Sequence, residues 1–399
     1  MPRLTSLFTA NLRRIAVNLP PNNGGSASSS KQTPNLMPTK PSPTSHQIKF
    51  AAGLLIAWVL IATNTLHAQD TARKYKEENL NFTYKGGDIS GKLITPNAYK
   101  NNLPVIVFVH GSGPEDYSSE DNYRYLWEAF TNIGFACYSW DRPGVGQSQG
   151  KWYEASVQDR ADEVIAAVNK LKTFSTIDST RIGFWGISQA GWVMPLVAKE
   201  IKPAFVITVS SPVTTAFEQE LYRVTSEMQA AGFAQNDIKK AMSYNSSLLQ
   251  MIREDKPYKH FEALQKETEG VAWADNVIRG EELVYSYLSI VLKSDRAPDL
   301  SSLTCPVLAI WGENDLVVPP KLGLETYGRQ LSRIDNKDVT LKIIPKADHT
   351  LTHNLTGLRA ETIARREKYK DNPKEIFAAG YVSMMTDWLK VRSNSAAHR

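Results

Sequence analysis

The sequence predicts an α/β protein built on a doubly wound, mostly parallel sheet of eight strands. Short apolar runs alternate with amphipathic stretches over most of the chain, which is the order that parallel sheets require. One interval, residues 213–299, breaks this alternation with helical periodicity, high charge and no strand-like run. Of the 399 residues, those after residue 68 are enough for one large core with this helical segment inserted after the sixth strand.

The predicted strands start with an antiparallel hairpin at the sheet edge, formed by Asn79–Tyr84 and Ile89–Ile94. The other six are the apolar runs Pro104–Val109, Phe135–Trp140, Ile182–Trp185, Phe205–Val209, Val307–Trp311 and Val339–Ile344. Helical spacing of apolar residues predicts a scaffold helix at Asp159–Lys172 and a final helix at Ile376–Val391. The expected core therefore comprises residues 69–212 and 300–399.

The helical interval 213–299 is rich in large apolar and aromatic residues. Most of them are expected to form the core of this helical interval, while a minority lines a pocket for a modest-sized, partly apolar ligand. The candidates are Phe217, Leu221, Tyr222, Met228, Met242, Tyr244, Leu248, Leu249, Met251, Trp273, Tyr285, Tyr287 and Leu288.

Residues 1–68 differ in composition from the rest of the chain. They contain six basic residues and no aspartate or glutamate, and residues 22–45 are dominated by Pro, Ser, Thr, Asn and Gly, which cannot build a packed core. Lys49 precedes thirteen apolar residues, 50–62, and Ala68 follows them, which is the arrangement of a secretory signal peptide. We therefore expect export to the periplasm or the extracellular space after cleavage near Ala68.

Two alternatives remain open for this leader. If it is not cleaved, it anchors the protein in a membrane, although a comfortable span needs about 20 apolar residues. Translation from Met37 instead of Met1 gives a leader of ordinary signal-peptide length. Removing the six leader cations from 46 leaves 40 basic residues against 41 acidic ones, so neither a nucleic-acid partner nor stable membrane insertion is expected for the cleaved protein. The sequence leaves the oligomeric state open.

Cofactor and metal motifs are missing from the sequence. It contains no C-x-x-C or H-E-x-x-H pair and no glycine-rich dinucleotide or phosphate loop after a strand, so no cofactor and no metal is expected. Cys137 and Cys305 are the only cysteines. Because they belong to strands that lie several positions apart in the expected sheet, we predict two free, mostly buried thiols.

The strongest sign of chemistry is the segment Gly186-Ile187-Ser188-Gln189-Ala190-Gly191, which lies between an apolar run and an apolar-periodic stretch. A sharp strand-to-helix turn pushes a serine hydroxyl out of the sheet and aims the first helical amides at an oxyanion formed beside it. Ala190 stands where the G-x-S-x-G pattern has glycine. Taken alone, the string is weak evidence, because a serine at a helix start also serves as an N-cap.

An acid and a base follow Ser188 in a definite order. Asp315 lies in the loop after Val307–Trp311, and His349 comes shortly after Val339–Ile344. This order of nucleophile, acid and base is the one that α/β-hydrolases have, and it differs from that of chymotrypsin-like and subtilisin-like proteases. Upstream, a predicted strand leads into His110-Gly111-Ser112-Gly113-Pro114, where these enzymes place a loop that donates the second oxyanion amide.

On these motifs, residues 79–391 resemble the α/β-hydrolase superfamily, as a secreted serine esterase or acyl hydrolase with a helical cap. Asp141-Arg142-Pro143-Gly144-Val145-Gly146-Gln147-Ser148 is similar to the family's D-x-x-G-x-G-x-S turn after the fourth strand. The resemblance implies the α/β-hydrolase fold. It also implies Ser188 as nucleophile, His349 as general base and then general acid, Asp315 as the group that orients the imidazole, and the backbone amides of Gln189 and Ser112 as oxyanion donors.

Each assignment has a competitor in the sequence. Glu313 lies two residues from Asp315, His353 lies close to His349, and Gly113 competes with Ser112 for the second oxyanion amide. The family spacing G-x-x-D-x-x-V-P favours the acid named above, and the position directly after the last strand favours His349. His110 is expected to brace the oxyanion loop.

The resemblance implies an exported serine hydrolase that cleaves carboxylic esters of a small acyl substrate through an acyl-enzyme. An aminopeptidase-like peptidase and a thioesterase remain as alternatives, because the same three residues serve all of them. A peptidase would use acidic cap residues such as Glu281 and Glu282 to hold a free amino terminus. A non-catalytic binding protein on the same scaffold is the third class.

Overall fold

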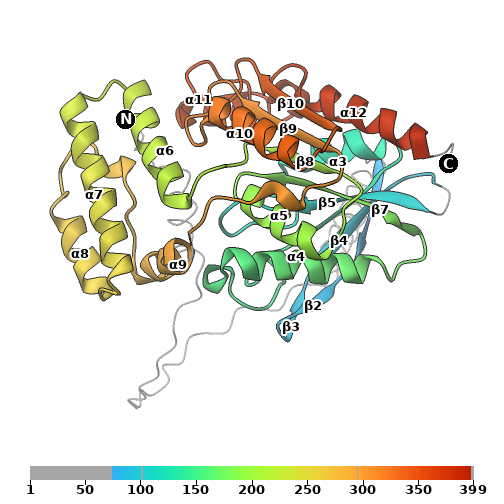
Figure 1. Ribbon diagram of the computed structural model, residues 1–399, viewed down its shortest axis with the longest axis horizontal. Helices are drawn as coiled ribbons and strands as arrows, with labels where there is room; N and C mark the ends of the chain where they lie inside the picture. The colour runs from blue at the N-terminus through green and yellow to red at the C-terminus, as the bar shows by residue number, and fades with distance from the viewer. Residues whose placement is uncertain (1–73, 100–101, 294, 397–399) are drawn as a thin grey trace, which may run out of the picture. The chain divides into compact units, whose positions relative to one another are not determined.

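The computed structural model describes residues 74–99, 102–293 and 295–396 (Figure 1). The predicted signal peptide, its cleavage site near Ala68 and the choice between Met1 and Met37 lie outside the described residues. Within the described part of the chain, no helix combines the length and the hydropathy that a membrane span requires.

The central sheet has eight strands in the order β1-β4-β6-β5-β7-β8-β9-β10. β4 pairs antiparallel with β1 and with β6, whereas every other neighbouring pair is parallel. The strands are Tyr75–Asn79 (β1), Gly91–Pro96 (β4), Leu103–Val109 (β5), Ala136–Trp140 (β6), Ile177–Ile187 (β7), Val206–Val209 (β8), Val307–Gly312 (β9) and Val339–Ile344 (β10). The prediction of a mostly parallel sheet of eight strands is confirmed.

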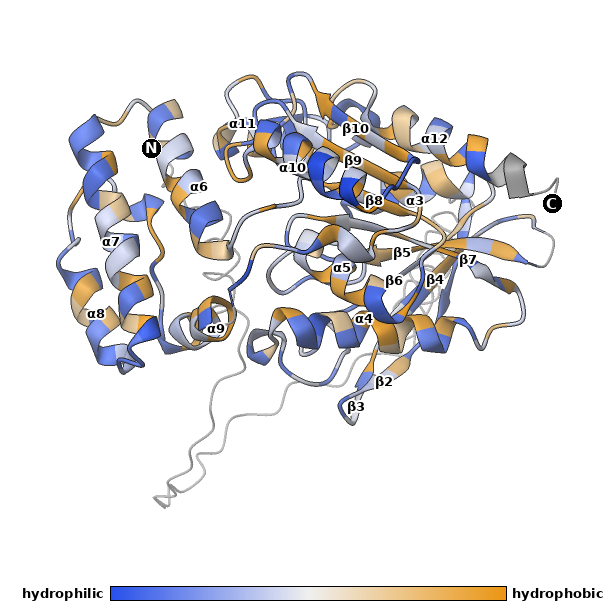
Figure 2. Cartoon of the chain, in the orientation of Figure 1, coloured by the Kyte–Doolittle hydropathy of each residue, from blue (hydrophilic) through white to orange (hydrophobic). Residues whose placement is uncertain are grey.

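Helices cover both faces of this sheet, which explains why its central strands are continuous apolar runs (Figure 2). Successive residues of β5 point to opposite faces: Val107 packs with one set of helices and Phe108 with the other. α4 (Val157–Leu171), α5 (Ala190–Glu200) and α10 (Pro320–Arg333) cover the first face. α3 (Arg124–Thr131) and α12 (Tyr381–Ala396) cover the second.

The predicted edge hairpin is wrong in its extent. β1 and β4 form the edge of the main sheet, while β2 (Phe82–Tyr84) and β3 (Gly87–Ile89) pair in a separate two-stranded sheet. The chain crosses itself at Gly91, whose N–H binds the Asn81 side chain and whose carbonyl accepts from Leu80. A Cβ at Gly91 would lie 2.4 Å from the Leu80 carbonyl oxygen, so this close crossing requires glycine.

The scaffold helix and the last strands lie close to their predicted ranges, but the final helix starts later than expected. α12 begins at Tyr381, after Gly380 in the left-handed conformation with φ 85°. Phe377, which the apolar periodicity placed in this helix, instead forms a β-bridge with Thr352. Phe377 thus belongs to an extended segment and not to the helix. The spacing of apolar residues alone does not distinguish such a segment from the first turn of a helix.

Four helices follow β8, the sixth strand of the sheet, and form the cap: α6 (Ala216–Ala230), α7 (Gln235–Arg253), α8 (Tyr258–Lys266) and α9 (Glu282–Lys293). α6 starts with a capping box in which Thr215 and Glu218 bind each other's backbone amides. The cap has its own buried cluster, and eight of the thirteen predicted apolar residues belong to it: Met228, Tyr244, Leu248, Leu249, Trp273, Tyr285, Tyr287 and Leu288.

Both cysteines are free, as predicted. Cys137 is buried in β6 and Cys305 is partly buried before β9. Burial raises the pKa of the Cys137 thiol well above its usual value, so this group stays protonated and unreactive at neutral pH.

Candidate active site

The predicted strand-to-helix turn lies between β7, which ends at Ile187, and α5, which starts at Ala190. Ser188 has φ 56°, a left-handed conformation that a residue with a side chain rarely adopts. Its carbonyl accepts from the Gly191 amide at 2.8 Å, which closes the turn. This conformation presents the serine side chain to the cavity above the sheet.

Small residues allow α5 to approach both β7 and the segment that follows β8. A Cβ at Gly186 would lie 2.6 Å from the Ala190 Cβ, and a Cβ at Gly191 would lie 2.5 Å from the Ser211 Cβ. The alanine at position 190 is therefore accommodated by the missing side chain at Gly186. The departure from the G-x-S-x-G pattern does not disturb the turn.

Asp315 and His349, which lie 34 residues apart in sequence, form a buried pair at the carboxyl ends of β9 and β10. The His349 Nδ1 lies 2.9 Å from Oδ2 and 3.1 Å from Oδ1 of Asp315. The amides of Val317 and Val318 each donate to Oδ1 at 2.8 Å, so the carboxylate is fixed by its own loop. Burial alone would lower the pKa of His349, but the charge and the hydrogen bond of Asp315 more than offset it and raise that pKa above 6.5.

The competing acid and base residues have other partners. Glu313 is exposed and accepts from the Lys346 amide at 3.0 Å, so it braces its loop from the outside. The backbone amide of His353 donates to the Ile376 carbonyl in the loop beyond the site. Asp348, next to His349, accepts from the backbone and side chain of Thr350 and so shapes the turn that carries the histidine.

The loop after β5 comes next to the serine turn. A Cβ built on Gly111 would lie 3.8 Å from the Ser188 Cβ. Ser112 lines the same cavity as Ser188, whereas the Gly113 carbonyl is turned inward to accept from the Arg142 Nη1 at 2.6 Å. The amide of Gln189 stands at the N-terminus of α5, where backbone N–H groups have no acceptor within the helix.

His110 braces this loop, as expected. Its Nε2 lies 2.7 Å from the Trp140 carbonyl oxygen, and its Nδ1 lies 3.2 Å from the Tyr123 hydroxyl. Burial lowers the pKa of His110 to about 3, so the ring is neutral and the Nε2–H donates to the carbonyl. A histidine that is held neutral between two fixed partners serves the loop and is not positioned to exchange protons with a substrate.

Arg160 of α4 is a site component that the sequence analysis missed. Its Nη2 donates to the His110 carbonyl at 2.6 Å, and its Nη1 donates to the Gln189 Oε1. The Gln189 Nε2 in turn lies 3.4 Å from the Tyr287 hydroxyl of the cap. Burial, and to a lesser degree the charge of Arg142, lowers the pKa of Arg160 to about 9. One guanidinium thus connects the two loops that carry the predicted oxyanion amides.

A cavity of about 920 Å³ contains Ser188, Ser112, Gln189 and His349 among its lining residues. Core loops form most of its wall. The cap contributes Ala216, Gln219, Arg223 and Val291, none of which the sequence analysis singled out. Those four positions are separated in sequence by the cap's own core residues, so their common direction follows only from how the helices pack.

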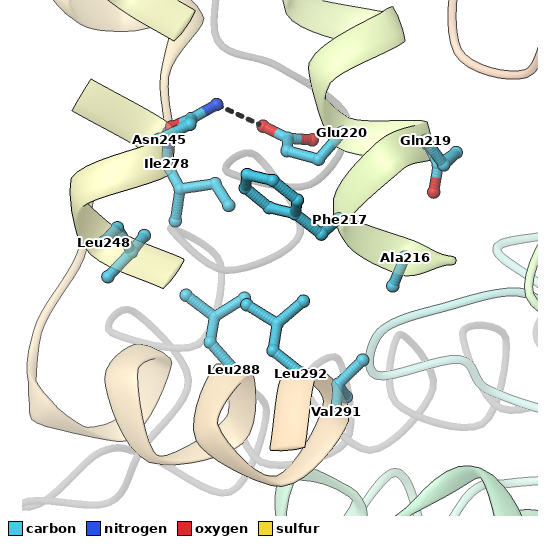
Figure 3. Close-up of a pocket in the computed structure, with 10 residues that line it drawn as sticks. All are labelled: Ala216, Phe217, Gln219, Glu220, Asn245, Leu248, Ile278, Leu288, Val291 and Leu292. Carbon is cyan, nitrogen blue, oxygen red and sulfur yellow. Dashed lines mark hydrogen bonds between the residues drawn. The ribbon is translucent and has the colours of Figure 1, made fainter. Parts of the chain in front are cut away.

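A second, much smaller cavity of about 20 Å³ lies among the cap helices (Figure 3). Phe217 projects from α6 toward it, and Leu288, Val291 and Leu292 point to it from α9 (Figure 3). Ala216, Gln219 and Val291 line both cavities, so the two lie next to each other. Its volume corresponds to about one water molecule or one methyl group.

Within residues 74–99, 102–293 and 295–396, no group of three or more His, Cys, Asp and Glu side chains is arranged to hold a metal ion.

Comparisons with known proteins place this site in context. Residues 100–356 match a family described as serine aminopeptidase, S33. An uncharacterized 31.7 kDa protein of Escherichia coli, from the traX-finO intergenic region, is 25% identical over 211 residues, which make up 50% of this chain and 69% of that protein.

Two solved esterases are also similar to the chain. Esterase Pf2001 of Pyrococcus furiosus has 18% identity and a TM-score of 0.46, over 79% of this chain and 91% of that one. Est1E of Butyrivibrio proteoclasticus, solved with ferulic acid bound, has 16% identity and a TM-score of 0.46, over 80% of this chain and 99% of that one.

Proposed function

Since this chain belongs to the serine aminopeptidase S33 family of the α/β-hydrolase superfamily and is a hydrolase, we propose that it cleaves carboxylic esters through an acyl-enzyme on Ser188. The observation that carries the proposal is the buried Asp315–His349 pair, which opens on the same cavity as a serine in a left-handed turn. A serine hydroxyl needs a nearby base to become a nucleophile. The imidazole of His349 is that base, and Asp315 holds it in the required orientation.

In the first half of the proposed reaction, the Ser188 Oγ attacks the ester carbonyl carbon while the His349 Nε2 removes its proton. Asp315 keeps the other ring nitrogen protonated, so Nε2 carries the lone pair. The amides of Gln189 and Ser112 stabilise the oxyanion of the tetrahedral intermediate. The bond to the alcohol oxygen then breaks, and His349 returns the proton to the leaving alcohol.

In the second half, water attacks the acyl-enzyme carbonyl and gives a proton to His349. The bond between the acyl carbon and Ser188 breaks, the proton returns to the serine oxygen, and the carboxylic acid leaves. Arg160 supports both halves because it holds the His110 carbonyl and the Gln189 side chain in place.

A peptidase that removes amino-terminal residues is the second candidate, favoured by the description of the matching family. The acidic residues considered for binding a free amino terminus, Glu281 and Glu282, are exposed at the start of α9 and do not line the large cavity. Glu220 lines the small cavity within the cap and forms a buried ion pair with Arg223. Other acidic residues do line that large cavity, namely Glu115, Glu120, Asp121 and Glu367, so the anilide arm of the test below decides between the two reactions. A thioesterase would use the same three residues as the esterase.

The test offers p-nitrophenyl esters of increasing acyl length and aminoacyl p-nitroanilides to the full-length protein and to Ser188→Ala. We expect ester hydrolysis that falls by about 10⁴-fold or more in the variant, and labelling of the wild-type serine by a fluorophosphonate. A preference for anilides would establish the peptidase instead. Ester turnover that survives in the variant would refute the assignment of the nucleophile.

We also propose that the enzyme works outside the cytoplasm, after removal of a leader that ends near Ala68. Six cations before a short apolar run support this proposal. Mass spectrometry of the protein from its native host would give an amino terminus close to residue 69. Peptides from residues 1–36 would also refute a start at Met37.

A further inference from the structure

Helix α11 (Arg359–Lys368) forms one wall of the large cavity, close to the catalytic histidine proposed above. Its residues at spacings of four and three, Arg359, Ile363 and Arg366, line the cavity and therefore share one helical face. Figure 1 shows α11 on the side of the core near α6 of the cap. In agreement with this position, the charge of Arg359 opposes the rise that burial causes in the pKa of Glu227 in α6.

This helix is not held by apolar burial, because none of its residues is buried. Polar contacts fix it instead. Glu361 accepts from the amides of Leu355 and Thr356, the Thr362 hydroxyl donates to Asp348, and Arg365 donates to the carbonyl of Ile376. A helix that adds nothing to the core but presents two guanidinium groups to the cavity is better explained by the ligand than by folding.

Arg366 faces the cavity with an incomplete set of partners. Its Nη1 donates to the Asn122 Oδ1 at 2.7 Å. Its Nε is buried and has no hydrogen-bond acceptor, and no carboxylate among the described residues forms an ion pair with it. Burial lowers the pKa of this guanidinium, which measures the cost of withdrawing the charge from water. Such a cost is normally offset by an anion.

The acidic groups near Arg366 are engaged elsewhere. Asp348 is occupied by the turn that carries His349 and by Thr362. Glu115 accepts from the Ser119 hydroxyl, and burial raises the pKa of its carboxyl, which favours the neutral form. Together with Glu120 these groups favour the charged form of Arg366 from a distance, but none of them binds its free Nε.

The other basic residues at the wall of the cavity have partners of their own. Arg124 pairs with Glu77, Arg223 with Glu220, and Lys370 with Glu367. Among the described residues that line the cavity, the guanidinium left for a ligand is therefore that of Arg366, and Arg359 lies about two helical turns away on the same helix.

We propose that Arg366, assisted by Arg359, binds a carboxylate of the substrate, so that the preferred ester carries a negative charge on its acyl part or on its alcohol part. A planar guanidinium offers a carboxylate two parallel N–H groups, and the Nε and Nη2 edge of Arg366 is the edge that Asn122 leaves unoccupied. This inference rests on the proposed ester hydrolysis at Ser188 and specifies its substrate class.

The test uses two matched pairs of esters with the full-length protein. Mono-p-nitrophenyl glutarate against p-nitrophenyl pentanoate places the carboxylate on the acyl part, and 4-carboxyphenyl acetate against phenyl acetate places it on the alcohol part. For each pair the ratio of kcat/KM, charged over neutral, is measured in wild type and in variants. Comparing variants cancels the intrinsic reactivity of the esters.

We expect Arg366→Gln to lower this ratio about tenfold or more for one of the two pairs, which identifies the side of the ester that carries the charge. Arg366→Lys keeps the charge but not the planar fork, and should give an intermediate ratio. Lys368→Gln is the matched control, because it removes the same charge from an exposed position of the same helix that does not line the cavity. Its ratio should equal that of wild type.

A binding measurement separates this inference from a folding defect. Glutarate should raise the Tm of Ser188→Ala, and the rise should disappear when Arg366→Gln is added, with the unliganded Tm as the reference. Equal losses for charged and neutral esters in Arg366→Gln, or a loss as large in Lys368→Gln, would overturn the anion site. If Ser188-dependent hydrolysis of neutral esters persists without any charge preference, the proposed function stands and only this inference fails.

Discussion

The core and the cap differ in what holds them together and in what they bring to the site. The core buries continuous apolar strands on both faces of its sheet, with residues such as Val107 and Phe108 fully enclosed. The cap buries a cluster among α6 to α9 that also includes Trp152 of the core, whose ring centroid lies 5.1 Å from that of Tyr287. Near the site, polar contacts join cap and core. Tyr222 donates to the Asp315 carbonyl at 3.0 Å, and Gln219 donates to the Val317 carbonyl at 3.1 Å.

This difference teaches that the core carries the groups proposed for the chemistry, whereas the cap only completes the cavity wall. Ser188, Asp315 and His349 all follow core strands, where the sheet fixes their positions. The cap supplies four residues of the cavity wall and none of the groups proposed to act on the reacting atoms. Substitutions of site residues in the core should therefore lower kcat strongly, and substitutions in the cap should lower kcat/KM only weakly.

The largest effect is expected from Asp315→Asn. The asparagine Oδ1 keeps the hydrogen bonds from the Val317 and Val318 amides, but the amide nitrogen then faces the His349 Nδ1 and favours the wrong tautomer. We expect kcat to fall about 10⁴-fold with little change in thermal stability. Steady-state kinetics and a melting curve measure both quantities. Glu313→Gln is the control, and a comparable loss of kcat in this variant would mean that Glu313 and not Asp315 orients the imidazole.

Arg160→Met should follow, although this residue touches no substrate. The change removes the bonds to the His110 carbonyl and to Gln189, so the two proposed oxyanion segments lose a common support. We expect kcat to fall by about tenfold to a hundredfold while KM changes little, somewhat less than the loss of a direct oxyanion donor. Affinity for a boronic-acid inhibitor should fall in parallel. Unchanged inhibitor affinity would assign Arg160 to stability alone.

The pH dependence should report the raised pKa of His349. Only the neutral ring accepts the Ser188 proton, so kcat/KM should fall about tenfold per pH unit below an apparent pKa that lies above 6.5. The stability of the protein should change in the opposite direction. Protonated His349 stabilises the folded state fully below its unfolded pKa, and this contribution is lost as the pH rises through the raised folded pKa. Rate profiles and urea titrations of Ser188→Ala would show the two trends. An acid limb below 6.5 contradicts the Asp315 pairing.

The smallest effect is expected in the cap. Tyr222→Phe removes the hydroxyl that donates to the Asp315 carbonyl but leaves the side chains of the site in place. A single neutral hydrogen bond contributes about 1 kcal/mol, so kcat/KM should fall only a few-fold. Measuring the whole ester series would show whether all substrates lose equally. A loss as large as that of Arg160→Met would contradict the expectation that cap residues affect the reaction only weakly.

Local sequence predicted the serine turn well, because its requirements are steric and close in sequence. Gly186 is needed where β7 meets α5 and Gly191 where α5 meets Ser211 after β8, and both glycines can be recognised from the string alone. The hairpin was predicted less well, because β1 starts before the apolar run and the crossing at Gly91 divides it into two sheets. Pairing partners in a sheet depend on the whole register, which a local pattern does not contain.

By itself, the sequence determined the sheet, the order of its catalytic candidates and the presence of a helical insertion, since apolar periodicity and turn residues act over short distances. Only the tertiary structure decided which cap residues face the cavity, that Arg160 joins two loops, and that no carboxylate of the described residues pairs with Arg366. Each of these depends on groups from segments remote in the chain: Arg366 and Asn122 are 244 positions apart. Whether a charge is paired is a property of the packed structure, because folding sets the distances between such groups.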